Sequence, residues 1–128
     1  MCGGVRFEVT EPPVSAVSCH CTRCQRRTGT AASISARLAP GSLKILQGED
    51  LLSAWRPPEG FAKVFCSECG SGLWSQSVTD PEVISVRFGV FDDDPGVRPT
   101  CHQFVAYAAV WQPLPDDGLP RFDERRPA

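Results

Sequence analysis

The sequence lacks any long hydrophobic run, which excludes a membrane-spanning helix. None of its 128 residues belongs to a stretch approaching the roughly 18–20 apolar residues that a helix needs to cross a bilayer. The N-terminus also lacks a charged segment followed by an apolar one, so a signal peptide is not predicted. We therefore expect a cytoplasmic protein with no membrane partner.

An excess of charge is missing as well. The formal net charge is -2 and no long basic run occurs, so binding to nucleic acid through overall charge is disfavoured. A length of 128 residues with 41% hydrophobic residues predicts one domain with a modest core. Twelve prolines and eleven glycines disfavour long helices and favour short strands joined by turns.

Alternating apolar and polar residues predict a mainly antiparallel all-β domain. The expected strands cover residues 5–9, 31–38, 43–46, 51–55, 62–65, 73–77, 83–91 and 103–111. Only residues 22–29 predict a helix: they lack this alternation and end at Gly29, so we expect one or two turns with Gly29 as the C-terminal cap. We expect a zinc-containing domain over residues 1–115 and a loose C-terminal extension over 116–128.

Seven cysteines are many for such a chain, and six of them could serve as metal ligands. One cluster is Cys19-x-Cys21-x-x-Cys24, and the other is Cys66-x-x-Cys69. In a cytosolic protein, closely spaced cysteines more often bind a metal or perform redox chemistry than form disulfides. A C-x-x-C turn allows two sulfurs to converge on one tetrahedral zinc ion.

Spacing alone leaves three interpretations open. Both C-x-x-C pairs can share one closed, structural zinc, as in a zinc ribbon. Alternatively, the first cluster holds one zinc with three sulfurs and an open fourth position, while Cys66 and Cys69 hold another with Cys2 or Cys101. Cys66-x-x-Cys69 can also be a redox dithiol, although no strand–helix–strand pattern surrounds it.

Four blocks of the sequence resemble the GFA family, the glutathione-dependent formaldehyde-activating enzymes and their relatives, which include the centromere protein V domain. These blocks are CGGVRFEV, SCHCTRCQRRTG, FCSECGSGLW and CHQFV, and they run in family order over nearly the whole chain. The resemblance implies a small all-β fold of short antiparallel strands, called a β-tent, with two zinc sites. It also implies carbon–sulfur lyase chemistry on a glutathione–formaldehyde adduct, S-hydroxymethylglutathione.

By this resemblance, Cys19, Cys21 and Cys24 would hold the catalytic zinc, and Cys66 and Cys69 the structural zinc. The family's N-terminal pattern is C-x-C-G, of which only Cys2-Gly3 is present here. Either the natural start lies further upstream, or the structural site has three sulfurs. We expect Cys101 to be a free buried thiol.

The remaining candidate residues surround the first cysteine cluster. Arg26 and Arg27 follow it directly and are candidates for binding a carboxylate of glutathione. We expect His20 to lie beside the metal ligands or to face solvent rather than to bind the metal. His102 is expected to be a half-buried polar residue at a turn, and a role in supporting the site or orienting the substrate is the alternative. The substrates would then be a small thiol and an aldehyde. The alternative function is a zinc-stabilised binding module, which would have its fourth zinc position filled by His20 or Cys101.

Overall fold

Two β-sheets build the protein, whose computed structural model describes residues 1–128. The first sheet pairs β1 (Arg6–Val9) with β4 (Leu43–Gln47). The second has eight strands in the order β10-β9-β2-β3-β8-β7-β6-β5. Their bounds are β2 Ser15–Cys19, β3 Ser33–Arg37, β5 Leu52–Trp55, β6 Phe61–Cys66, β7 Gly72–Ser77, β8 Ile84–Arg87, β9 His102–Gln103 and β10 Arg121–Phe122. The prediction of a small all-β fold is confirmed.

The helices are short. The α-helix α1 (Thr22–Thr28) begins at the first cysteine cluster and ends at Gly29, whose left-handed backbone caps it as predicted. Three 3-10 helices complete the chain: η1 (Glu49–Leu51), η2 (Phe88–Val90) and η3 (Val105–Tyr107). No helix combines the length and the apolar character that crossing a membrane requires.

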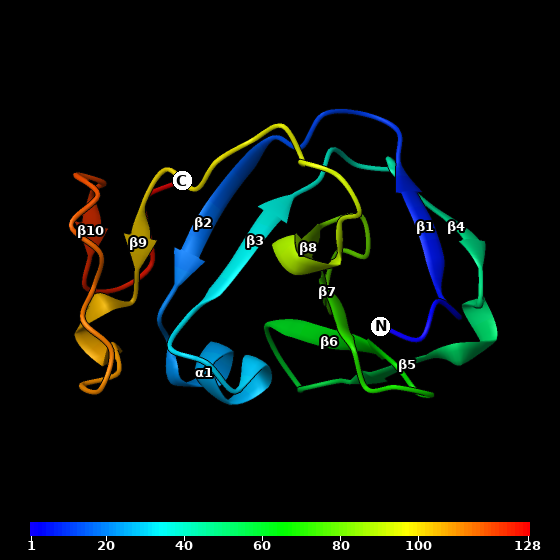
Figure 1. The fold of residues 1–128 in the computed structure, drawn as a ribbon, viewed down its shortest axis with the longest axis horizontal. Helices are drawn as coiled ribbons and strands as arrows, with labels where there is room; N and C mark the ends of the chain where they lie inside the picture. Colours follow the sequence, from blue (N-terminus) through cyan, green and yellow to red (C-terminus); the bar gives the residue numbers. More distant parts are fainter.

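The arrangement in space follows the strand order (Figure 1). The β1–β4 pair lies at one end of the molecule and the β9–β10 pair at the other, with α1 beside the lower ends of β2 and β3. Strand β9 pairs with β2 and β10 in parallel, whereas all other neighbours are antiparallel. A long connection after β8 crosses the top of the molecule to reach β9.

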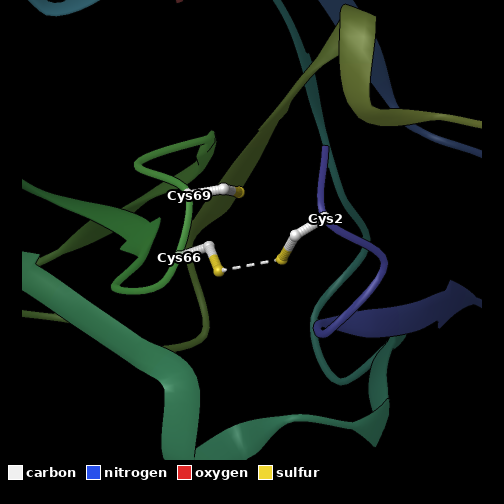
Figure 2. Close-up of side chains that lie close together, drawn as sticks. All are labelled: Cys2, Cys66 and Cys69. Carbon is white, nitrogen blue, oxygen red and sulfur yellow. Dashed lines mark hydrogen bonds between the residues drawn. The ribbon is translucent and has the colours of Figure 1, made fainter.

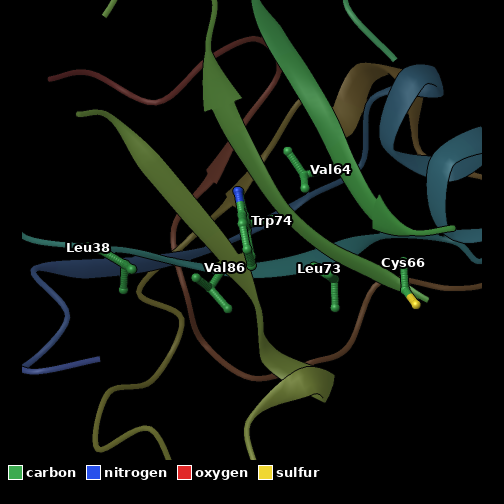
Figure 3. Close-up of a cluster of buried hydrophobic side chains, with 6 residues drawn as sticks. All are labelled: Leu38, Val64, Cys66, Leu73, Trp74 and Val86. Carbon is green, nitrogen blue, oxygen red and sulfur yellow. The ribbon is translucent and has the colours of Figure 1, made fainter. Parts of the chain in front are cut away.

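The core fills one face of the eight-stranded sheet. The register aligns Ala36, Val86, Trp74 and Val64 in a row across four strands. Val86 is fully buried, and the Phe7 ring of β1 packs edge-on against Trp74 with 5.5 Å between ring centroids. Figure 3 shows the central cluster, which is Leu38, Val64, Cys66, Leu73, Trp74 and Val86. The β1–β4 pair therefore covers the apolar face of the larger sheet.

The opposite face of the sheet is polar. The next row of the register aligns Ser85, Ser75, Lys63 and Trp55, and Arg87 pairs with Ser35 of β3. Lys63 and Ser75 are nevertheless buried, with 8% and 5% of their surfaces exposed. Both faces of this sheet are thus covered, although only one of them is apolar.

Two predicted strands differ from the structure. The strand expected over residues 103–111 is wrong: pairing stops at Gln103, because Phe104 adopts a left-handed backbone (φ 59°) and η3 follows. The strand expected over 83–91 ends at Arg87, where η2 begins. Strand β2 was not predicted; its sequence SAVSC contains small residues that give little alternation.

The C-terminal residues run along the outer edge of the larger sheet. Arg121 and Phe122 pair with β9, and the backbone N–H of Phe104 donates to the carbonyl of Glu124. The domain boundary expected at residue 115 stays a prediction, while these contacts place residues 121–124 against β9 and η3.

Candidate metal centres and active site

The seven cysteines form two groups of three, and one remains apart. In each group the sulfur atoms all lie within 4.8 Å of one another. One group is Cys19, Cys21 and Cys24, and the other is Cys2, Cys66 and Cys69. The zinc ribbon is wrong, because its two C-x-x-C pairs fall into different groups. Cys101 is buried and belongs to neither group.

The first group sits where β2 passes into α1. Cys19 is the last residue of β2, Cys21 is the N-cap of α1, and Cys24 is its one buried residue. The backbone N–H of Cys24 donates to the Cys21 sulfur at 3.3 Å, so the cap of the helix is itself a thiol. The C-x-x-C spacing therefore serves two purposes, because it starts the helix and it brings the sulfurs together.

The three thiols of this group differ in pKa. The pKa of Cys21 is lowered to about 2, because the thiols of Cys19 and Cys24 and backbone N–H groups donate to its sulfur. The hydrogen bond to Cys21 raises the pKa of Cys19, and hydrogen bonds to Cys19 and Cys21 raise the pKa of Cys24. Negative charge thus concentrates on Cys21, and a thiolate is the form that binds a metal ion.

The second group joins residues 1–5, which precede β1 and which we call the N-terminal arm, to the turn between β6 and β7 (Figure 2). Cys2 approaches this turn from the arm, and its sulfur lies 3.8 Å from that of Cys66. Four sulfurs placed tetrahedrally at about 2.3 Å from one zinc ion are about 3.8 Å apart, so this spacing fits a zinc site. The backbone N–H groups of Ser71 and Cys2 lower the pKa of Cys69 to about 6.

A side-chain amide holds the N-terminal arm in place. Gln47 Nε2 donates to the backbone carbonyls of Gly3 at 3.3 Å and of Gly4 at 3.1 Å. The next residue, Gly48, has a φ of 80° and leaves no room for a side chain against the backbone of Gly4. These contacts position Cys2, which is exposed, opposite the buried Cys66.

Two histidines form a hydrogen-bonded chain beside the first group. His20 Nε2 lies 2.9 Å from His102 Nδ1, and His102 Nε2 lies 2.8 Å from a carboxylate oxygen of Asp117. Because a carboxylate only accepts, His102 donates from Nε2 to Asp117; when His102 is neutral, its Nδ1 then accepts from His20 Nε2. Burial, with a smaller contribution from His102, lowers the pKa of His20. Asp117, which no motif of the sequence singles out, completes this chain.

The two candidate arginines point in different directions. Arg26 is exposed and makes no hydrogen bond. Arg27 is half-buried, reaches across to β6 and donates to the carbonyl of Val64 at 3.0 Å. Arg23, inside the C-x-x-C turn, extends over the ring of Trp55, 5.3 Å from its centroid. Of the arginines on α1, Arg23 and Arg27 thus both lie against the polar face of the sheet, Arg23 over Trp55 and Arg27 at Val64.

A family model matches the chain over residues 1–107, which include both cysteine groups, α1 and His102. The model describes the glutathione-dependent formaldehyde-activating enzymes. The chain belongs to the GFA family. As a member of this family it is related to enzymes that activate formaldehyde through glutathione.

One solved structure shows the same fold. The crystal structure of a Rhodobacter sphaeroides protein is similar to this GFA chain with a TM-score of 0.58, at 24% identity and over 94% of both chains. No curated protein matches the chain in sequence. The family is therefore shown by the match to its model, and the Rhodobacter sphaeroides structure supports the fold.

A pocket beside β1 of the GFA chain lies away from the first cysteine group. It measures about 880 Å³ and lies between β1 and residues 89–95, next to the N-terminal arm. Its titratable groups are Arg6, Glu8, Glu11 and the carboxylates of residues 92–94; Arg6 pairs with Asp92 at 2.5 Å. No cysteine or histidine lines it, so its size alone does not make it an active site.

Proposed function

We propose that the chain is a zinc-dependent, carbon–sulfur lyase-like enzyme. Its substrate would be the adduct of glutathione, or another thiol, with a small aldehyde, such as S-hydroxymethylglutathione. In the lyase direction the carbon–sulfur bond breaks, the hydroxyl oxygen becomes the aldehyde oxygen, and the hydroxyl proton is transferred to the sulfur. The observation that carries this proposal is the group of Cys19, Cys21 and Cys24, which contains three sulfurs and no fourth protein ligand.

Three thiolates are a donor set that suits zinc and leaves one coordination position for a substrate. A zinc ion bound there would supply a Lewis acid that favours the thiolate form of a bound thiol. The chain's own residues hold the three sulfurs in place. The backbone N–H of Cys24 fixes Cys21, and the strand pairing of Cys19 with Ser33 fixes the end of β2.

The geometry favours the enzyme over the zinc-stabilised binding module. That alternative needs His20 or Cys101 as a fourth ligand, and neither is in the group. Instead, His20 Nε2 is hydrogen-bonded to His102 Nδ1, and His102 is in turn hydrogen-bonded to Asp117. Arg27 and Arg26 remain candidates for a carboxylate of glutathione, with Arg27 the better placed of the two.

Zinc content and exchange kinetics test the proposal. Elemental analysis of the purified chain should find about two zinc ions per molecule, and Cys19→Ser should lose one of them. Exchange NMR should then show that the zinc-loaded protein accelerates the interconversion of S-hydroxymethylglutathione with glutathione and formaldehyde, and that Cys19→Ser does not. If the zinc-loaded protein leaves the spontaneous rate unchanged, the lyase assignment is wrong.

A further inference from the structure

Three cations gather on the polar face of the larger sheet. Lys63 of β6 and Arg87 of β8 both donate to the hydroxyl of Ser75, at 3.3 and 3.1 Å. Arg87 also donates to the hydroxyls of Ser33 and Ser35 on β3. Arg27 reaches the same region from α1, where its guanidinium lies against the backbone of Gly72. We call Arg27, Lys63 and Arg87 the cationic cluster.

No carboxylate neutralises the cationic cluster. The ion pairs of the protein join Arg6, Arg98 and His102 to aspartates elsewhere, and the cluster's own partners are serine hydroxyls and one backbone carbonyl. The Nε atoms of Arg27 and Arg87 are buried and have no hydrogen-bond partner at all. Burying charge and N–H donors without partners is costly, so the missing partner is a negatively charged group from outside the chain.

The nearby cysteines compensate only part of this charge. Burial and the neighbouring Arg87 lower the pKa of Lys63, while the sulfurs of Cys24 and Cys21 act in the opposite direction. Burial and Arg87 lower the pKa of Arg27 as well. A zinc ion with three thiolates carries one net negative charge, whereas the cationic cluster carries three positive charges. An excess of positive charge therefore remains beside the sulfurs.

A pocket opens directly onto two members of the cluster. It measures about 440 Å³, and Arg27, Arg87, Ser33 and Gly72 contribute to its wall together with Phe88 and Val90. Pockets that bind small molecules typically measure about 300–1,000 Å³ and combine apolar walls with a few polar groups. The pocket thus has the size and the composition to accept a small acidic ligand.

The register of the strands connects this pocket to the cysteines. Ser33 pairs with Cys19 across the antiparallel β2–β3 ladder. Residues directly opposite in such a ladder share a face, with their Cβ atoms about 4.5–5.5 Å apart. An anion bound at Arg87 and Ser33 would therefore lie beside the sulfur of Cys19. The rest of the same ligand could then reach the metal centre.

We propose that Arg27, Lys63 and Arg87 form an oxyanion site that binds a carboxylate of the substrate and positions the substrate beside the first cysteine group. Arg87 is the main anchor, and Arg27 closes the site from α1. This inference rests on the proposed function for the source of the carboxylate, which is either the thiol or an aldehyde that itself carries an acid group. In both cases the enzyme selects an acidic substrate.

Calorimetric titration of the zinc-loaded full chain tests the site without turnover. The probes are glutathione, its diethyl ester, which lacks both carboxylates, and glyoxylate, an aldehyde with one carboxylate. If the thiol supplies the group, the diester should bind at least about tenfold more weakly than glutathione. If the aldehyde supplies it, glyoxylate should bind while glutathione and its diester bind alike.

Matched variants identify the anchor. Arg87→Gln and Arg27→Gln should each weaken binding of the acidic probe by about tenfold or more. Arg125→Gln removes the same charge from an exposed residue that makes no hydrogen bond, and should change nothing. If Arg87→Gln does not fold, the result for Arg27→Gln is used instead, since Arg27 lies on α1 and not in a strand of the sheet.

Two results would overturn the oxyanion site. One is that glutathione binds the wild-type chain no more tightly than its diester does and that glyoxylate does not bind. The other is that the glutamine variants bind the acidic probe as tightly as Arg125→Gln does. Neither result depends on catalysis: a chain that binds the acidic probe as expected but fails to accelerate exchange would refute the lyase function and leave the oxyanion site standing.

Discussion

Replacing Gly48 with alanine should detach the N-terminal arm from the rest of the protein. A Cβ atom at this position would fall on the carbonyl oxygen of Gly4, and would lie 2.8 Å from its carbonyl carbon and 2.9 Å from the Cα of Val5. These are backbone atoms, which cannot rotate away as a side chain can. The arm that carries Cys2 would therefore have to move.

The expected cost has two parts. Residue 48 has a φ of 80°, and a left-handed conformation costs an alanine about 1–2 kcal/mol. Forcing the arm outward adds about 1–3 kcal/mol, as overpacking does in a core. Together they predict a loss of about 2–5 kcal/mol in the free energy of unfolding. Gly41→Ala is the matched control, because its φ is 73° and its Cβ would meet only the Glu82 carboxylate at 4.0 Å.

Urea denaturation and zinc analysis measure both consequences. Gly41→Ala should lose only the conformational part and keep two zinc ions. Gly48→Ala should lose more stability and also release the zinc of the second cysteine group, because Cys2 moves with Gly4. Equal destabilisation of the two variants, with equal zinc content, would show that the arm does not depend on Gly48.

Three further predictions address the core, the cysteines and the response to pH. Val86→Ala should cost about 1–3 kcal/mol in urea denaturation, because it removes two methyl groups from a fully buried side chain. Cys101→Ser should keep both zinc ions in elemental analysis; loss of one would make Cys101 a ligand. The pKa of His20 lies below its usual 6.5, so as the pH falls below 6.5 the unfolded chain takes up a proton that the folded chain does not. The free energy of unfolding should therefore fall with pH below 6.5, with a smaller slope in His20→Gln.

The sequence predicted the elements that carry local signals. The helix over residues 22–29 and its cap at Gly29 agree with the structure, because a capping glycine and the absence of alternation are both local. Local sequence signals could not decide between one shared zinc site and two separate ones. The answer depends on whether β2 and the β6–β7 turn meet, and strand order decides that.

The cationic cluster was missed for a related physical reason. Alternation along a strand shows that two faces differ, but not that both are covered. Lys63 and Arg87 lie on the polar side of their strands, which is normally the side that faces water. Here α1 and its Arg27 cover that side, which only the folded arrangement reveals. The apolar run over residues 103–111 predicts a buried strand, but the strand ends at Gln103 and Val110 is fully exposed.

The position of Cys2 has a practical consequence for producing the protein. Met1 is exposed, and the next residue contributes a sulfur to the second cysteine group. An N-terminal polyhistidine tag would place several imidazoles beside this group, and imidazoles bind the same metal ions. Such a tag would supply extra metal ligands and raise the measured zinc content. A C-terminal tag, or one removed by cleavage, should report the protein's own affinity.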